Sequence, residues 1–292
     1  MTVSNPPDRR ELIVVSGAST GMGAATAREL ARRGFHVLAG VRRDVDGEAL
    51  RADGIEPCIL DITVESDVAA IADRVARDPL SRPLRALVNN AGIAVNAPVE
   101  ALPIAEWRRL FDVNLFGHVA MIQALMPALL HSAGTVVNIS SIGGKVALPT
   151  YPAYAGAKFA LEALSDSLRR EVNGLGLKVV VVEPGAVKTE MAQRGVATAD
   201  RLKAGMTTDQ LERYGDLIDA MSNLARSFDT DGVPAERAAK VIANAATARR
   251  PRTRYTIGRD AAILVRLSRV VSDRSLDRVV RMVLRPHFKA NA

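Results

Sequence analysis

Short apolar runs alternate along this chain with stretches of helical periodicity. The runs predicted as strands lie at 11–16, 36–40, 56–60, 84–89, 135–140, 178–183 and 254–257. Several of them, Lys178–Val182 for example, are continuously apolar, which is typical of parallel strands covered on both faces. The pattern predicts an α/β fold built on a doubly wound parallel sheet.

Length and composition favour a single domain with a C-terminal helical extension. The chain has 292 residues and 48% hydrophobic content, enough for one large core, and no linker-like tract or repeat interrupts it. Cys58 is the only cysteine, which excludes an intrachain disulfide. Residues 1–10 lack an apolar leader, no apolar run reaches the ~18–20 residues that span a bilayer, and the four histidines lack ligand spacing. We expect a cytoplasmic protein without a metal site.

A glycine-rich turn follows the first predicted strand. Leu12–Val15 leads into Ser16–Gly23, and an alanine-rich helical pattern follows at 24–33. Glycine lets the backbone approach a ligand closely, and the free N–H groups at a helix N-terminus favour a pyrophosphate. The turn therefore predicts a dinucleotide site, with an ordinary strand–helix turn as the alternative.

Tyr154 and Lys158 lie four residues apart in a second alanine-rich helical pattern. Residues at this spacing share a helix face. A nearby cation favours the phenolate and lowers the pKa of a tyrosine, so Tyr154 can serve as a general acid/base. The alternative is a solvated helix face that carries both residues.

These features resemble the short-chain dehydrogenase/reductase family, whose motifs run in order over residues 11–190. They are Gly17, Gly21 and Gly23 with Ser16 in place of the usual Thr, Asp61–Thr63, Asn89–Gly92, Asn114, Ser140–Ser141, Tyr154 with Lys158, and Pro184–Gly185 with Thr189. The resemblance implies a Rossmann-like sheet, an NAD(P)-dependent oxidoreductase and a homodimer or homotetramer. Residues 158–171 are similar to the retinol and hydroxysteroid dehydrogenase branch, which handles lipophilic alcohols and ketones.

The resemblance also implies a role for each site residue. Tyr154 exchanges a proton with the substrate oxygen, Lys158 binds the nicotinamide ribose, Ser141 polarises the substrate oxygen and Asn114 orders a water. An asparagine that bonds its own helix is the alternative for Asn114. The remaining cofactor contacts are Gly17, Ser19, Thr20, Gly21, Met22 and Gly23 at the phosphates, Asp61 and Ile62 at the adenine, Asn90, Ala91 and Gly92 at its ribose, and Pro184, Gly185, Val187 and Thr189 at the nicotinamide.

The end of the second strand indicates which nicotinamide cofactor binds. An NAD site places a carboxylate there for the ribose 2′-hydroxyl, whereas an NADP site places positive charge there for the 2′-phosphate. Here Gly40 and Val41 are followed by Arg42 and Arg43. We therefore expect NADP(H) rather than NAD(H). A shifted loop that brings Asp44 to the ribose is the alternative.

Two segments outside the motifs predict further features. Residues 191–232 lie where the family places a lid over the substrate, although their apolar spacing also fits plain core contacts. Residues 259–292 form a basic helical tail, and residues 249–292 carry 12 basic and 3 acidic side chains. From Leu276 to Leu284 apolar residues recur at helical spacing beside an arginine stripe. We expect this helix to dock on protein, with weak peripheral membrane contact second, and we expect no nucleic-acid binding.

Three functions fit the sequence. The first is an NADP(H)-dependent oxidoreductase that acts on a lipophilic secondary alcohol, ketone or aldehyde. The second is a regulatory protein that binds the nucleotide without turnover, for which a broken set of catalytic residues is expected. The third is a membrane-surface protein. The intact set Asn114, Ser141, Tyr154 and Lys158 favours the first function.

Overall fold

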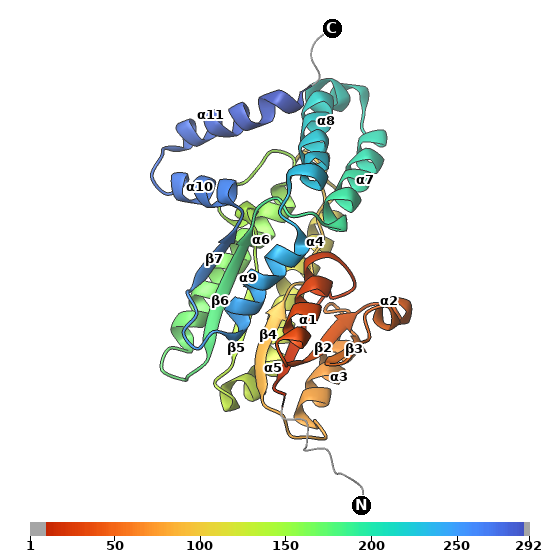
Figure 1. The fold of residues 1–292 in the computed structure, drawn as a ribbon. Helices are drawn as coiled ribbons and strands as arrows, with labels where there is room; N and C mark the ends of the chain where they lie inside the picture. The colour runs from red at the N-terminus through yellow and green to blue at the C-terminus, as the bar shows by residue number, and fades with distance from the viewer. Residues whose placement is uncertain (1–9, 289–292) are drawn as a thin grey trace, which may run out of the picture.

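The computed structural model describes residues 10–288, and a seven-stranded parallel sheet forms its centre (Figure 1). The strand order is β3-β2-β1-β4-β5-β6-β7. The strands are β1 (Leu12–Val15), β2 (His36–Val41), β3 (Ile55–Ile59), β4 (Leu84–Asn89), β5 (Thr135–Ile139), β6 (Lys178–Pro184) and β7 (Arg254–Ile257). The seven predicted strands are confirmed, and so is the doubly wound Rossmann-like sheet.

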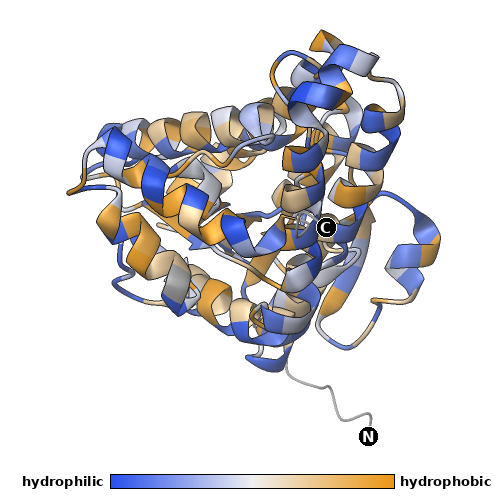
Figure 2. Cartoon of the chain, turned by 90° about the horizontal axis from the view of Figure 1, so that it is seen from above, coloured by the Kyte–Doolittle hydropathy of each residue, from blue (hydrophilic) through white to orange (hydrophobic). Residues whose placement is uncertain are grey.

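Helices cover both faces of the sheet, as the apolar strands require. Helices α1 (Gly21–Arg32) and α9 (Ala235–Thr247) pack on one face. The other face is covered by α3 (Glu65–Ala76), α5 (Gly117–His131) and α6 (Pro152–Glu171). Alternate residues of β1 enter the two cores, because successive side chains of a strand point to opposite faces. The helices carry hydrophilic and hydrophobic residues side by side (Figure 2), as amphipathic helices do.

A helical hairpin of α7 (Glu190–Ala204) and α8 (Thr208–Asp231) occupies the segment predicted as the lid. Helix α8 begins at a capping box, in which Thr207 Oγ1 accepts from the Gln210 backbone N–H at 3.3 Å and Gln210 Oε1 accepts from the Thr207 N–H at 3.1 Å. Tyr214 on α8 also donates a hydrogen bond from its hydroxyl to Glu100, which lies outside the hairpin, at 2.8 Å. The capping box therefore fixes where α8 begins, and the bond from Tyr214 to Glu100 connects the helix to the rest of the protein.

The remaining short helices are α2 (Asp44–Glu48), α4 (Ile104–Phe111), the π-helical turn η1 (Asp112–Phe116) and the 3₁₀ turn η2 (Ile142–Gly144). Helix α4, η1 and α5 run on as one helical stretch from Ile104 to His131, which is long and apolar enough by length and composition to cross a membrane. The expectation from the sequence concerned uninterrupted apolar runs and did not anticipate this stretch, which meets the criterion although Asn114, His118 and Gln123 interrupt it. In this structure α5 packs against β4 and α3, as a core helix does.

The predicted C-terminal helices are α10 (Arg259–Leu267) and α11 (Asp273–Leu284), followed by η3 (Arg285–His287). Helix α11 meets α8 at its C-terminal end (Figure 1), where Leu284 is buried and Asn223 Nδ2 donates to the His287 carbonyl at 3.0 Å. Met282 and Val283 are 71% and 49% exposed. The described contacts of α11 with α8 thus lie at its C-terminal end, while Leu276, Val279 and Val280 of its apolar face are half-buried. Residues 1–9 and 289–292, which include the end of the predicted tail, lie outside the described residues.

Candidate active site

A cavity of about 460 Å³ lies where the strand order reverses between β1 and β4. In open α/β sheets, ligands bind at this point, beyond the carboxyl ends of the strands. The predicted site residues that line it are Gly17, Ser19, Thr20, Gly21, Met22, Gly23, Arg42, Asp61, Ile62, Asn90, Ala91, Gly92, Ser141, Tyr154, Lys158, Pro184, Gly185, Val187 and Thr189. Arg43 and Asn114 are not among the lining residues. The fold thus brings almost the whole predicted set to one cavity.

The glycine turn has the backbone shape that a dinucleotide requires. Gly17 and Gly21 have φ of +65° and +56°, a region that L side chains rarely adopt. A Cβ on Gly23 would lie 2.2 Å from the Gly17 carbonyl oxygen, so only glycine fits there. Helix α1 starts after Thr20 without a side-chain cap, which leaves its first N–H groups free for a ligand. The turn therefore fits the phosphates of the cofactor.

Ser16 joins this turn to the end of β4. Its hydroxyl accepts hydrogen bonds from the Asn90 and Ala91 backbone N–H groups, each at 3.1 Å. The Asn90 Nδ2 donates in return to the Ser16 and Gly17 carbonyls, each at 3.0 Å. Ser16 was not predicted as a site residue, although its place at the usual threonine of the glycine motif was the signal for it.

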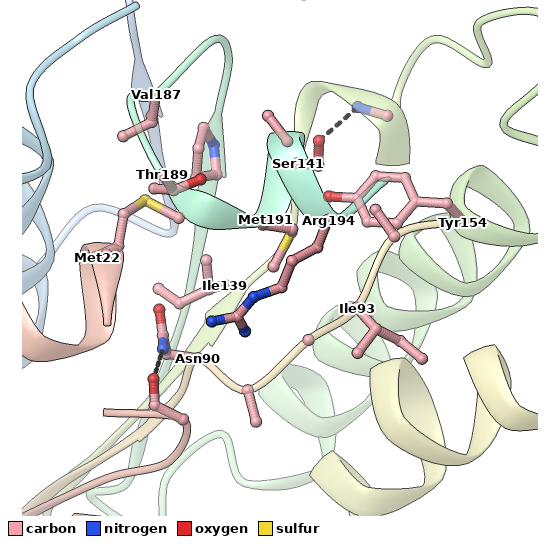
Figure 3. A pocket seen from close by; sticks show the side chains of 18 of the residues that line it. Met22, Asn90, Ile93, Ile139, Ser141, Tyr154, Val187, Thr189, Met191 and Arg194 are labelled. Atoms are coloured by element: carbon pink, nitrogen blue, oxygen red, sulfur yellow. Dashed lines mark hydrogen bonds between the residues drawn. The ribbon is translucent and has the colours of Figure 1, made fainter. Parts of the chain in front are cut away.

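Tyr154 and Lys158 lie one turn apart on α6, as their spacing predicts. Lys158 Nζ is 5.9 Å from the centre of the Tyr154 ring and donates to the Ile139 carbonyl at 2.8 Å. Ser141 follows β5, and its Oγ accepts from the Gly143 N–H at 3.0 Å. Figure 3 shows the hydroxyls of Ser141 and Tyr154 on the same side of the cavity. The arrangement brings two hydroxyls and one ammonium to a common wall.

Burial shifts the pKa values of both ionisable groups. It raises the pKa of Tyr154, and the neighbouring Ser141 hydroxyl opposes this shift. It lowers the pKa of Lys158 to about 8, against the charge of Glu162. The expected lowering of the Tyr154 pKa by Lys158 is therefore not found in this arrangement, where burial raises that pKa and the Ser141 hydroxyl is the group that opposes the rise. Lys158 still carries its charge at pH 7.

Asn114 lies in η1 and is completely buried. Its Oδ1 accepts from the Ile93 N–H at 2.9 Å, and its Nδ2 donates to the Ile93 carbonyl at 2.8 Å. The side chain thus fastens the backbone of a residue that lines the cavity. It bonds another segment rather than its own helix, and its predicted role in ordering a water stays a prediction.

A buried cluster of charged side chains connects the Ser141 loop to α6. Glu162 accepts from Lys145 Nζ at 2.7 Å and from Arg254 at 3.0 Å. Arg254 also lies 3.4 Å from Glu183, which is 1% exposed. Burial and the charge of Glu162 raise the pKa of Glu183. The cluster connects η2, α6, β6 and β7, so it fixes the wall that carries Ser141 and Tyr154.

Comparison with known proteins identifies the family. Residues 11–200 match the family described as short chain dehydrogenase. The chain belongs to the short-chain dehydrogenase/reductase family. It is therefore an NAD(P)-dependent oxidoreductase. Retinol dehydrogenase 7 of Mus musculus is 34% identical over 258 residues, which are 86% of this chain and 81% of that protein. The 3-amino-tetrahydro-pyrrolizinone reductase of Xenorhabdus hominickii is 32% identical over 271 residues, 92% of this chain and 94% of that protein.

Solved structures of this family share the fold. A short-chain dehydrogenase of Streptomyces avermitilis is 28% identical with a TM-score of 0.74, over 95% of this chain and 98% of its own. A second one, from Burkholderia cenocepacia and in complex with NADP, is 24% identical with a TM-score of 0.72, over 96% of this chain and 99% of its own. The identity of 34% to retinol dehydrogenase 7 confirms the predicted resemblance to the retinol and hydroxysteroid dehydrogenase branch of the family.

The β2 end of this dehydrogenase presents one of the two predicted arginines to the cavity. Arg42 lines it. Arg43 instead binds Asp46 with its Nε and Nη2 atoms at 2.8 and 2.6 Å. Asp44 begins α2 and does not line the cavity. Of the two arginines expected to bind the cofactor here, Arg42 lines the cavity and Arg43 does not.

Helices α7 and α8 contribute a largely apolar part of the cavity lining. Met191, Met221, Leu224 and Phe228 belong to it. Ile218, also expected in the lid, is a buried core residue. Among residues 10–288, no group of three or more His, Cys, Asp or Glu side chains is placed to hold a metal ion. The cavity of this dehydrogenase therefore joins a polar, glycine-lined half to an apolar half.

Proposed function

We propose that this protein is an NADP(H)-preferring oxidoreductase that acts on a lipophilic secondary alcohol, ketone or aldehyde. The observation that carries the proposal is one cavity lined both by Ser141, Tyr154 and Lys158 and by the apolar side chains of Met191, Met221, Leu224 and Phe228. Relatives named retinol dehydrogenase 7 and 16 and NADPH-dependent 3-dehydrocapnine reductase support this substrate and cofactor class.

The catalytic roles follow from the positions of the hydroxyls and the ammonium. Bound nicotinamide supplies or accepts the hydride. In reduction, Tyr154 donates its phenolic proton to the carbonyl oxygen, and Ser141 donates a hydrogen bond to the same oxygen. The positive charge of Lys158 stabilises the phenolate that Tyr154 leaves behind. In oxidation, Tyr154 accepts the proton of the alcohol instead. Asn114 keeps the backbone at Ile93 in place beside them.

The apolar part of the lining supports a lipophilic substrate. Met191 on α7 and Met221, Leu224 and Phe228 on α8 offer no hydrogen bond to a sugar or a small polar acid. Methionine adapts its shape to irregular apolar ligands. The α7–α8 hairpin then acts as the lid that keeps water from the reacting atoms.

Positive charge at the end of β2 supports NADP(H). Arg42 lines the cavity there, and no carboxylate precedes it in β2. A guanidinium binds a phosphate through paired charge-assisted hydrogen bonds. One solved relative in fold is described in complex with NADP and another with NAD. The proposed preference for NADP(H) therefore rests on Arg42 and not on the cofactors bound in these solved structures.

Turnover of a chromophoric cofactor tests the proposal. NADPH consumption is measured over steroid, retinoid, quinone and fatty ketone panels, first with the unchanged protein and then with Tyr154→Phe. The variant should lose about 10²–10⁴-fold in rate while its affinity for NADPH stays nearly the same. Tyr151→Phe is the matched control, since its ring lies 6.1 Å from that of Tyr154 in the same cavity. Near-normal turnover by Tyr154→Phe refutes the assignment, and NADPH binding without turnover on any panel favours the regulatory alternative.

The expected partners stay proposals. Self-association into a homodimer or homotetramer is supported by Phe116 and Phe159, which are 58% and 44% exposed on the neighbouring elements η1 and α6. Weak peripheral membrane contact is supported by Met282 and Val283, which are exposed on a helix with three arginines. Light scattering measures the first, and sedimentation with anionic vesicles measures the second. A cytoplasmic location is compatible with both self-association and weak peripheral membrane contact.

A further inference from the structure

Arg194 enters the cavity from α7, although no cofactor motif includes it. It lies on the second turn of that helix and lines the cavity. Figure 3 shows its guanidinium directed away from α7 and toward Asn90. Its ion-pair partner is Glu190, one turn earlier on the same helix. The apolar segment predicted as a lid therefore places a cation over the nucleotide half of the cavity.

The Arg194 pair with Glu190 is a weak one. The two side chains are 61% and 50% exposed, and exposed i,i+4 pairs contribute little to stability because water and salt screen them. A phosphate dianion offers more charge and more acceptor atoms than one carboxylate. Arg194 can therefore leave Glu190 for a phosphate at small cost.

Arg42 from the end of β2 and Arg194 from α7 both line the cavity. Arg43 lowers the pKa of Asp46 most strongly, and the charges of Arg194 and Arg42 lower it further. Asp46 raises the pKa of Arg43 most strongly, and the charge of Glu190 raises it further. The charges of Arg194 and Arg42 thus both act on the carboxylate of Asp46 in α2. Arg43 binds that carboxylate and does not line the cavity, so in this structure Arg42 is the arginine that the end of β2 presents there.

We propose that Arg194 exchanges Glu190 for the 2′-phosphate of the cofactor and, with Arg42, forms an arginine clamp across the cavity. The inference rests on the proposed preference for NADP(H). Arg42 comes from β2 and Arg194 from α7, so the clamp joins the nucleotide-binding body to the lid. NADP(H), but not NAD(H), would therefore hold α7 in place over the substrate half.

Direct binding titrations test the clamp without relying on turnover. Quenching of protein fluorescence gives Kd for NADPH and for NADH in the unchanged protein, in Arg194→Ala and in Arg42→Ala. Arg201→Ala is the matched control, because Arg201 is 68% exposed on the same helix and does not line the cavity. Arg194→Ala should raise Kd for NADPH about 10-fold, as for the loss of a charge-assisted contact, and leave Kd for NADH within about two-fold. Arg201→Ala should change neither.

A second variant tests the exchange of partners. Glu190→Gln removes the competing carboxylate and frees Arg194, so it should lower Kd for NADPH while leaving Kd for NADH unchanged. Limited proteolysis adds an independent readout. NADPH should protect the α7 segment more than NADH does at equal saturation, and Arg194→Ala should abolish the difference.

The other outcomes overturn the proposal in distinguishable ways. Equal weakening of NADPH and NADH by Arg194→Ala would place Arg194 at the shared pyrophosphate and refute the clamp. No weakening in Arg194→Ala, together with lost preference in Arg42→Ala, refutes the clamp and leaves the proposed cofactor preference intact. Equal affinity of the unchanged protein for NADPH and NADH refutes both.

Discussion

Lys158 is needed for the proposed chemistry but destabilises the fold. Its residue is 4% exposed, and burial lowers its pKa from 10.5 to about 8, against the opposing charge of Glu162. At about 1.4 kcal/mol for each pKa unit, keeping Lys158 charged at pH 7 costs the folded state about 3 kcal/mol. The hydrogen bond from Nζ to the Ile139 carbonyl at 2.8 Å stabilises the folded state by about 1 kcal/mol and so offsets part of this cost.

We therefore expect Lys158→Met to unfold less readily at pH 7, although it loses activity and cofactor affinity. Methionine has a similar length and carries no charge to bury. The free energy of unfolding should rise by about 2 kcal/mol, the difference between the two contributions. Urea titrations followed by circular dichroism measure it in the absence of cofactor. Lys240→Met on α9 is the control, because Lys240 is exposed and should give no comparable gain.

The pH dependence gives the same reasoning a second, independent check. The pKa of Lys158 is lower in the folded state than in the unfolded state, so the unfolded chain binds more protons between pH 8 and 10.5. Stability of the unchanged protein should rise through this window relative to Lys158→Met, because the penalty is full below pH 8 and vanishes above 10.5. The difference between the two proteins should therefore shrink as the pH rises. A variant that is less stable at pH 7, or two parallel pH profiles, would refute the reasoning.

Three further predictions concern other parts of the structure. Asn114→Ala should lower the free energy of unfolding by about 2–4 kcal/mol, since it leaves both backbone groups of Ile93 unpaired, and urea titration measures this. Gly23→Ala should fold but lose cofactor binding in titrations, because the new Cβ would lie 2.2 Å from the Gly17 carbonyl oxygen; unchanged binding would contradict this. Met282→Glu should leave Tm unchanged, since that side chain is 71% exposed, but should reduce sedimentation with anionic vesicles.

The centre of the sheet was predictable because strands such as β1, β5 and β6 are buried on both faces and so appear as largely unbroken apolar runs. The cofactor half of the cavity was predictable for a similar reason. Residues such as Gly17, Gly21 and Gly23 are required by backbone geometry, which depends on neighbours in the sequence. The spacing of Tyr154 and Lys158 on one helix face was equally local.

The parts that the sequence did not give depend on partners far along the chain. Arg43 turns to Asp46 and leaves Arg42 alone at the cavity. The amide of Asn114 bonds Ile93, 21 residues earlier. The pKa of Tyr154 depends on how much water the assembled cavity excludes, so the adjacent cation could not decide its direction. Arg194 lies in a segment where only the apolar pattern was informative.

The π turn η1 has a consequence for how this chain tolerates insertions and deletions. A π turn is an α-helix with an inserted residue, and here it lies between α4 and α5. Deleting one residue from Asp112–Phe116 would leave a sequence that still forms a continuous helix. Because the π turn absorbs the extra residue locally, α4 and α5 would keep nearly the same faces, and the change would fall on the backbone of the turn itself. Asn114 would then no longer face Ile93. A shortening by one residue that looks harmless in a helix would therefore disable the site more thoroughly than most substitutions in the lid.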